Sequence, residues 1–185
     1  EHVVFLSVLG AEKNPLLPHR RIERHIEDST LSYAFLRASF FMQNFYVVHR
    51  IDIVEWGELS VPAGSGKTSF VDARDVAAVG VEALLDTGPP NRAFDVTGPE
   101  ALTYAEAAAV FSDVLDRDIE YADPGAIEFV RTATRRGASL PFALVQVVVY
   151  TTARLGLAGR VTDDVERTLR NEFMSNLART SRRDA

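Results

Sequence analysis

The chain has 185 residues, a formal net charge of −6 and 46% hydrophobic residues, a composition typical of a globular protein with one well-formed core. The negative charge argues against general nucleic-acid binding, because neutralising phosphates requires a basic face. With no cysteine, disulfides, thiol catalysis and cysteine-ligated zinc are excluded. The most apolar stretch, Phe142–Tyr150, is too short to span a bilayer, and the opening run lacks the basic flank of a signal peptide. We therefore expect a cytoplasmic protein with neither a membrane nor a nucleic acid as its partner.

The start of the chain predicts a strand–helix–strand unit. Val3–Leu9 is almost continuously apolar, which is typical of a strand covered on both faces of a parallel sheet. An amphipathic helix is predicted from about His19 to Asp28, with Ile22 and Ile26 on its inner stripe. A second apolar strand follows at Tyr33–Leu36. Two such strands joined through a helix form a right-handed βαβ unit.

Charged residues crowd this first predicted helix. Arginines and acids alternate on it at helical spacing: Arg20, Arg21, Glu23, Arg24, Glu27 and Asp28. Opposite charges three or four residues apart are typical of a solvent-exposed helix face that carries ion pairs. We interpret this face as solvated.

A glycine-rich segment lies in the middle of the chain. Gly57 and Pro62 indicate a hairpin that reaches Thr68–Val71. Within it, Gly64–Thr68 ends like a phosphate-binding loop, but Val61 occupies the position of that pattern's first glycine. The segment also leads into a strand-like run, whereas a phosphate-binding loop must open a helix. We interpret it as a glycine-rich hairpin turn.

A further helix is predicted from Asp75, and its first turn is capped by Asp72 or by Asp75 itself. We interpret this pair of carboxylates as capping groups rather than a catalytic pair. The predicted apolar face of the helix comprises Val76, Val79, Gly80, Ala83 and Leu84. A strand follows at Ala93–Val96.

The last part of the chain is predicted to be mainly helical. Thr103 and Glu106 form a capping box that opens a helix. Its predicted apolar stripe comprises Ala107, Val110, Phe111, Val114 and Leu115. The elements predicted after it are a short strand at Ile119–Tyr121 and helices over Gly125–Arg136, over Pro141–Leu155 and from Thr162 onward.

Several motifs of catalytic or metal sites are absent from the sequence. No glycine fingerprint for a dinucleotide stands between a strand and a helix. No tyrosine is followed four residues later by a lysine, the proton-transfer pair of short-chain dehydrogenases. The four histidines, His2, His19, His25 and His49, lack the spacing of metal ligands, so no metal site is predicted.

An aromatic segment, Phe40–Phe45, directly follows the second predicted strand, at the start of a stretch with helical spacing that runs to Glu55. Ligands of doubly wound folds bind at this carboxyl end of a parallel sheet. The aromatic rings either stack on a nicotinamide or a flat substrate, or they pack the junction between two parts of the fold.

The opening strand is too apolar for a two-strand unit and demands neighbours on both sides. We expect another chain or an N-terminal segment to supply them. An exposed sheet edge of this kind also offers a route to a protein partner or to self-association.

Several segments in this order resemble the NmrA-like family of atypical short-chain dehydrogenases. The matching segments are Val3–Ala11, His19–Ile26, Leu31–Arg37, Phe40–Phe45, Phe70–Ala77, Phe94–Pro99 and Val161–Glu166. The resemblance implies a Rossmann core that binds NAD or NADP, and a small C-terminal domain for a small-molecule substrate. Members of the family include quinone reductases, isoflavone-reductase-like enzymes and catalytically silent redox sensors. In family terms the sequence starts at about the fifth strand, after the glycine fingerprint.

The resemblance also implies roles for individual residues. Ser7, Val8, Ala38, Ser39 and Phe40 match positions that line the cofactor. The substrate-binding positions are those of Phe41, Met42 and Asn44. His19 stands where reductases of the family carry a catalytic lysine, and it is the candidate proton donor. Ala38 and Ser39 stand where the family usually has Pro-Gly.

The fold class predicted from these observations is α/β, the C-terminal part of a Rossmann-type parallel sheet with a small α/β-helical substrate domain. Residues 1–40 are assigned to the Rossmann core, 41–175 to the substrate-type domain interleaved with remaining core elements, and 176–185 to a frayed tail. The function hypothesis is an NAD(P)H-dependent oxidoreductase acting on a quinone or small carbonyl compound. Two alternatives stay open: a non-catalytic NAD(P)H sensor that regulates a protein partner, and a truncated remnant without nucleotide binding.

Overall fold

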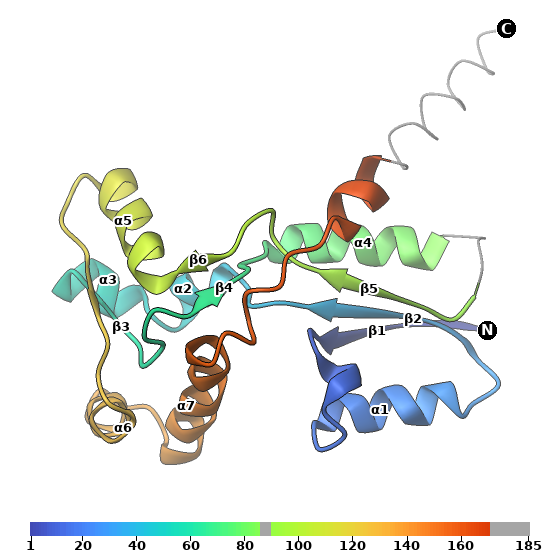
Figure 1. The fold of residues 1–185 in the computed structure, drawn as a ribbon, viewed down its shortest axis with the longest axis horizontal. Coiled ribbons are helices and arrows are strands. Elements are labelled where there is room, and N and C mark those ends of the chain that lie inside the picture. The colour runs from blue at the N-terminus through green and yellow to red at the C-terminus, as the bar shows by residue number, and fades with distance from the viewer. Residues whose placement is uncertain (86–89, 171–185) are drawn as a thin grey trace, which may run out of the picture. The chain divides into compact units, whose positions relative to one another are not determined.

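The computed structural model describes residues 1–85 and 90–170, and its path is shown in Figure 1. Its labelled elements, in chain order, are β1 (His2–Val8), the 3-10 helix η1 (Ala11–Lys13), α1 (Pro18–Glu27), β2 (Ser32–Ala38), α2 (Gln43–Val47), α3 (Arg50–Trp56), β3 (Glu58–Ser60), β4 (Lys67–Thr68), α4 (Ala73–Leu85), β5 (Arg92–Val96), β6 (Leu102–Thr103), α5 (Tyr104–Leu115), β7 (Glu120–Ala122), α6 (Ala126–Arg135) and α7 (Leu140–Arg154). Residues 164–170 are helical as well. The predicted frayed tail, 176–185, lies outside the described residues.

The chain forms two compact units, and each is built from segments that are far apart in the sequence. Of the described residues, unit 1 contains 1–41, 71–85, 90–99 and 161–170. Unit 2 contains Met42–Phe70 and Glu100–Arg160.

Unit 1 is a parallel sheet with helices on both faces, which confirms the predicted α/β fold class. The strand order is β1-β2-β5, and both pairs are parallel. In Figure 1, α1 lies against one face of the sheet and α4 against the other. Strand β1 is less covered than its apolar sequence predicts, since Leu6 is 47% exposed. The reason is positional: within the described residues β1 is an edge strand with a neighbour on one side.

The hydrophobic core of unit 1 lies between the sheet and α4. Its buried members are Ala34, Leu36, Ala38, Val71, Val76, Val79, Ala83 and Val96. Asp72 caps α4 as predicted, because its carboxylate accepts a hydrogen bond from the Arg74 N–H at 2.8 Å. Leu84, predicted on the buried face, is exposed instead. The contact stripe of α4 repeats at 76, 79 and 83, and the next position after Ala83 has rotated away from the sheet.

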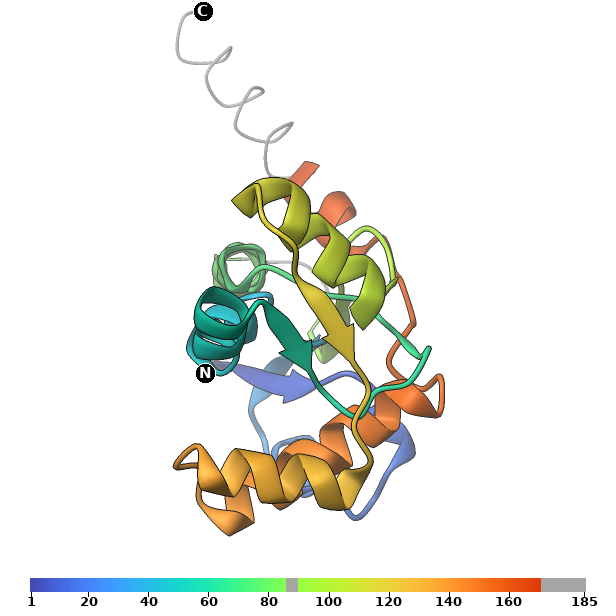
Figure 2. The same ribbon diagram turned by 90° about the vertical axis from the view of Figure 1, so that its left-hand side faces the viewer.

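Unit 2 contains two small sheets, and the predicted hairpin is not among them. Strand β3 pairs in parallel with β7, and Figure 2 shows these two strands side by side. Strand β4 pairs antiparallel with β6. Each strand of the expected hairpin therefore has a partner about 35 to 60 positions further along the chain.

The glycine-rich segment between β3 and β4 has a packing role rather than the predicted hairpin turn. A Cβ on Gly66 would lie 1.9 Å from the carbonyl oxygen of Ala153, at the end of α7. Only glycine allows two backbones to approach so closely. Gly66 is therefore glycine because the segment is pressed against α7, whereas Gly64 has the positive φ of +60° that a turn requires.

Helix α5 begins as predicted, with both hydrogen bonds of the Thr103–Glu106 capping box present. Its buried side is different from the predicted stripe: Tyr104, Ala107 and Ala108 are buried, whereas Val110 and Val114 are exposed. The packed side runs through Tyr104, Ala107, Ala108 and Phe111, because Tyr104 and Phe111 join an aromatic cluster. That cluster comprises Phe45, Phe70, Tyr104, Phe111, Tyr121, Phe129 and Tyr150.

Two kinds of feature are absent from the described residues. No helix in 1–85 or 90–170 has the length and apolar character needed to cross a bilayer. Across the same ranges, no group of three or more histidine and acidic side chains is arranged to hold a metal ion.

Candidate functional site

The residues predicted to line the cofactor lie together at the carboxyl ends of β1 and β2 in unit 1. Ser7 and Val8 close β1, and Val8 is paired in register with Ala38 at the end of β2. The Leu9 N–H donates to the carbonyl of Ala38 at 2.9 Å, and the Ser39 N–H donates to β5 at 3.0 Å. The sheet's own hydrogen bonds thus fix the backbone of this edge, which is where ligands of open α/β sheets bind.

The aromatic residues after β2 are divided between the two units. Phe41 forms a bridge with Val71 and packs against the hydrophobic core under α4. The Phe40 carbonyl accepts a hydrogen bond from the Val71 N–H at 2.9 Å. For Phe41 the contacts therefore correspond to the packing alternative. The other predicted substrate-binding residues belong to unit 2, where Met42 is exposed before α2 and Asn44 is half-buried within it.

His19, the predicted proton donor, lies in the first turn of α1, directly after Pro18. Its side chain is exposed, and its ring centroid is 6.4 Å from that of Phe5 on β1. The imidazole is therefore held near the sheet and open to solvent, as exchange of a proton requires. His19 and Ser7 belong to the same unit.

A buried charged cluster at this edge of the sheet was missed by the sequence analysis. We define the Glu23 cluster as Glu23, Ser7, Arg37 and Arg20. The Glu23 Oε1 atom accepts hydrogen bonds from Ser7 Oγ at 2.7 Å and from Arg37 Nε at 3.0 Å. Its Oε2 atom accepts from Arg37 Nη2 and from Arg20 Nη1, both at 3.0 Å.

The prediction of a solvated face on α1 is therefore wrong at Glu23, whose exposure is 0%. The predicted inner residue Ile22 is instead exposed, and Ile26 is half-buried. The physical reason lies in the sheet. Ser7 and Arg37 are neighbours in register on adjacent strands, and an arginine on a covered sheet face needs a counter-charge from the helix above it.

Burial by itself would raise the pKa of the Glu23 carboxyl. The hydrogen bonds from Arg37 and Ser7, with the positive charge of Arg37, outweigh that effect and hold the pKa below its usual range. The pKa of Arg37 is raised despite its burial, because Glu23, Glu12 and Asp95 surround it with negative charge. Both groups are thus ionised at neutral pH.

One signal in the sequence could have revealed this cluster. Along β2, alternate residues point to the same face of the sheet, so Tyr33, Phe35 and Arg37 share one face. Arg37 ends this aromatic row on a covered face, next to a buried serine. Its charge therefore requires an acid on the covering helix. Only the register of the two strands identifies that serine as Ser7.

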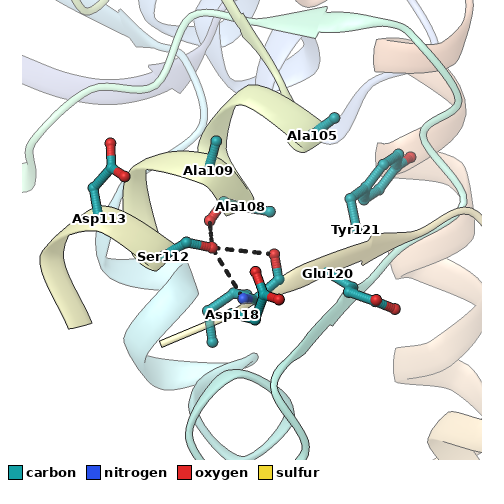
Figure 3. A pocket seen from close by; sticks show the side chains of 9 residues that line it. Ala105, Ala108, Ala109, Ser112, Asp113, Asp118, Glu120 and Tyr121 are labelled. Carbon is teal, nitrogen blue, oxygen red and sulfur yellow. Dashed lines mark hydrogen bonds between the residues drawn. The ribbon is translucent and has the colours of Figure 1, made fainter. Parts of the chain in front are cut away.

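Unit 2 contains an open depression between α5 and β7, shown in Figure 3. Alanines of α5 form one side, and Asp113, Asp118 and Glu120 are among the acids around it. Ser112 joins its two walls, since its hydroxyl donates to the Ala108 carbonyl at 3.0 Å and accepts from the Ile119 N–H at 2.9 Å. No residue predicted for the site lines this depression, and the Ser112 hydroxyl is bonded to the backbone of its walls.

A buried pair of polar side chains, His49 and Tyr150, lies inside unit 2. The Nε2 atom of His49 is 2.5 Å from the hydroxyl of Tyr150, and both residues are buried. Asp52 lies 3.8 Å from His49 Nδ1 and also accepts a hydrogen bond from Arg136 at 2.9 Å. Burial holds the pKa of the Tyr150 hydroxyl well above its usual value. This pair joins the start of α3 to α7 within the aromatic cluster.

Comparison with known proteins identifies the family of this chain. Over 99 residues the chain is 42% identical to an NAD(P)H azoreductase of Xenophilus azovorans, covering 54% of this chain and 34% of that protein. It is 36% identical over 136 residues to the oxidoreductase YesF of Bacillus subtilis, covering 73% of this chain and 48% of that protein. The chain thus spans a third to a half of the length of these relatives.

The fold matches solved structures as well. An NADPH-dependent quinone oxidoreductase of Escherichia coli, solved in complex with NADPH, superimposes with a TM-score of 0.83 at 20% sequence identity. The match covers 90% of this chain and 60% of that chain, and at this identity it establishes a shared fold. The model of the NmrA-like family matches residues 16–169. The chain therefore belongs to the NmrA-like family, whose fold is that of NAD(P)-binding Rossmann-type reductases.

Proposed function

We propose that this chain is the substrate-side part of an NAD(P)H-dependent oxidoreductase that reduces a quinone or another small carbonyl compound. The observation that carries the proposal is the family match over residues 16–169, together with the gathering of Ser7, Val8, Ala38 and Ser39 at one carboxyl edge of the sheet. The relatives named as an azoreductase and a quinone oxidoreductase support the same class of reaction.

The residues of the chain fit one end of a dinucleotide. The half-exposed edge formed by Val8, Ser39 and Phe40 offers a surface for a flat ring at the ends of two parallel strands. The turn after β1 carries one glycine, Gly10, and a Cβ there would meet nothing within 4 Å. The fingerprint that brings a pyrophosphate close to the backbone has three glycines, and this turn has one. In this proposal, strands and a phosphate-binding turn supplied beside β1 complete the site, and the exposure of Leu6 supports this place for them.

When bound, a reduced nicotinamide would supply a hydride to the substrate. Reduction of a quinone to a hydroquinone by a hydride also consumes one proton, and the residue proposed to deliver it is His19. Its exposed imidazole can regain a proton from solvent after each turnover. A histidine is a competent replacement for the family's lysine in this role, because an imidazolium, like an ammonium, can donate a proton.

The test compares the 185-residue chain with the product of its complete gene. Each protein is checked for folding by circular dichroism and titrated with NADPH by calorimetry, and NADPH oxidation is followed with a panel of quinones. We expect NADPH binding and turnover by the complete product. His19→Ala should lower kcat by about 10²-fold or more. His25→Ala, which changes another exposed histidine on the same helix, should leave kcat unchanged.

Three outcomes overturn this proposal in different ways. NADPH binding without turnover on any quinone identifies a redox sensor. Folded protein that does not bind NADPH in either form identifies a remnant without nucleotide binding. Turnover that survives His19→Ala unchanged removes His19 from the reaction.

A further inference from the structure

We infer that Glu23 is a positioning residue, which holds the first turns of α1, and with them His19, against the carboxyl ends of β1 and β2. The inference rests on the proposed function in naming His19 as the proton donor. Its structural part stands on the Glu23 cluster alone.

Glu23 is suited to this role because its carboxylate is fully used. Each oxygen accepts two hydrogen bonds, and the donors come from β1, β2 and α1 itself. Arg37 binds with two nitrogens, a paired geometry that fixes direction as well as distance. A carboxylate held at four points inside the protein leaves α1 little freedom to rotate or slide on the sheet.

The connection from Glu23 to His19 follows from helical spacing. The two residues are four positions apart on α1, so their side chains leave the same face of the helix one turn apart. The first turn of α1, which carries His19, is not fixed by a capping side chain, because Leu17 at the N-cap offers no side-chain oxygen. Glu23, one turn further along this face of α1, is hydrogen-bonded to both strands and therefore anchors the helix to the sheet.

The cluster also changes the role expected of Ser7. Its hydroxyl carries one hydrogen, which is donated to Glu23. The Ser7 hydroxyl therefore cannot donate a hydrogen bond to a cofactor or a substrate. Its function in this arrangement is to tie the end of β1 to α1.

The test uses two matched substitutions on one helix. Glu23→Gln removes the buried charge, whereas Glu27→Gln makes the same change at the exposed side of the same arginine, Arg20. The chain has four histidines, so the ring Cε1–H signals are few enough to assign by NMR. We expect Glu23→Gln to shift or broaden the His19 signal and to leave the His49 signal, in unit 2, in place. Glu27→Gln should move neither signal.

Activity provides a separate measurement in the complete gene product. Glu23→Gln should lower kcat for quinone reduction by about 10-fold and change the KM for NADPH by less than about twofold, because a displaced proton donor slows the chemical step rather than binding. If His19→Ala is fully active while Glu23→Gln still moves the His19 signal, the proposed function fails and the positioning role stands. An unmoved His19 signal in folded Glu23→Gln overturns the positioning role.

Ser7→Ala keeps the inference testable if Glu23→Gln does not fold. This substitution removes one of the four hydrogen bonds and leaves the buried charges paired. A His19 signal that shifts in Ser7→Ala, with the His49 signal unchanged, supports the positioning role. No shift of the His19 signal in Ser7→Ala contradicts it.

Discussion

Replacement of Gly66 by alanine tests how closely the segment between β3 and β4 packs against α7. The new Cβ would lie 1.9 Å from the Ala153 oxygen, 2.3 Å from its carbonyl carbon and 2.8 Å from the Arg154 nitrogen. All three are backbone atoms, so no side-chain rotation relieves the contact. The Ala153 oxygen also accepts the Gly156 N–H at 2.8 Å, and a displacement of the carbonyl weakens that hydrogen bond.

The expected cost combines these two effects. Overpacking in a close-packed interior costs about 1–3 kcal/mol, and loss of one hydrogen bond costs about 1 kcal/mol more. We expect Gly66→Ala to lower the free energy of unfolding by about 2–4 kcal/mol. For a chain of this length that corresponds to a fall in Tm of about 4–16 °C. Thermal unfolding followed by circular dichroism measures it directly.

Gly125→Ala is the matched control. A Cβ at Gly125 would meet nothing within 4 Å, and its backbone conformation, with φ −61° and ψ 152°, is one that alanine adopts freely. The small loss of capping preference and the reduced freedom of the unfolded chain offset each other, so the change should stay below about 1 kcal/mol. If Gly66→Ala melts at the same temperature as Gly125→Ala, the steric reasoning is refuted.

Three further predictions concern the polar contacts. Tyr150→Phe deprives buried His49 of its hydroxyl partner and should lower the free energy of unfolding by about 1–3 kcal/mol in urea titrations; an unchanged midpoint contradicts this. Thr103→Ala removes the cap of α5 at Glu106 and should cost about 0.5–2 kcal/mol, whereas Thr103→Ser, which keeps the oxygen, should cost much less. Glu23 binds a proton more tightly in the unfolded chain than in the folded protein, because folding lowers its pKa. The stabilisation by the ionised carboxylate is complete above the ordinary pKa of 4.5 and is lost as the pH falls through the folded-state pKa. The free energy of unfolding of Glu23→Gln should therefore fall less steeply below about pH 4.5 than that of the parent protein. An equal fall in both proteins contradicts the stabilising role of the Glu23 charge.

Many elements and helix caps were predicted correctly from local sequence patterns. The βαβ start, the capping box at Thr103 and the cap at Asp72 depend on residues that are neighbours in sequence, and the structure contains all three. The helix ends were predicted to within one or two residues for α1 and for α6. The family resemblance likewise rests on the order of short segments, and the match over 16–169 confirms it.

The errors share a physical cause, which is contact between residues far apart in the chain. Strand pairing decided that β3 and β4 have partners near residues 120 and 102 rather than each other. Glu23 has the sequence surroundings of a solvated helix face, yet it is buried because Arg37 and Ser7 of the sheet lie beneath it. The sequence by itself determined the helices and the parallel core, which follow from local periodicity and caps, and the family, which follows from the order of short segments. The tertiary structure alone decided which charges are buried and which backbones touch, because the free energy of burying a charge depends on the partners that folding brings to it.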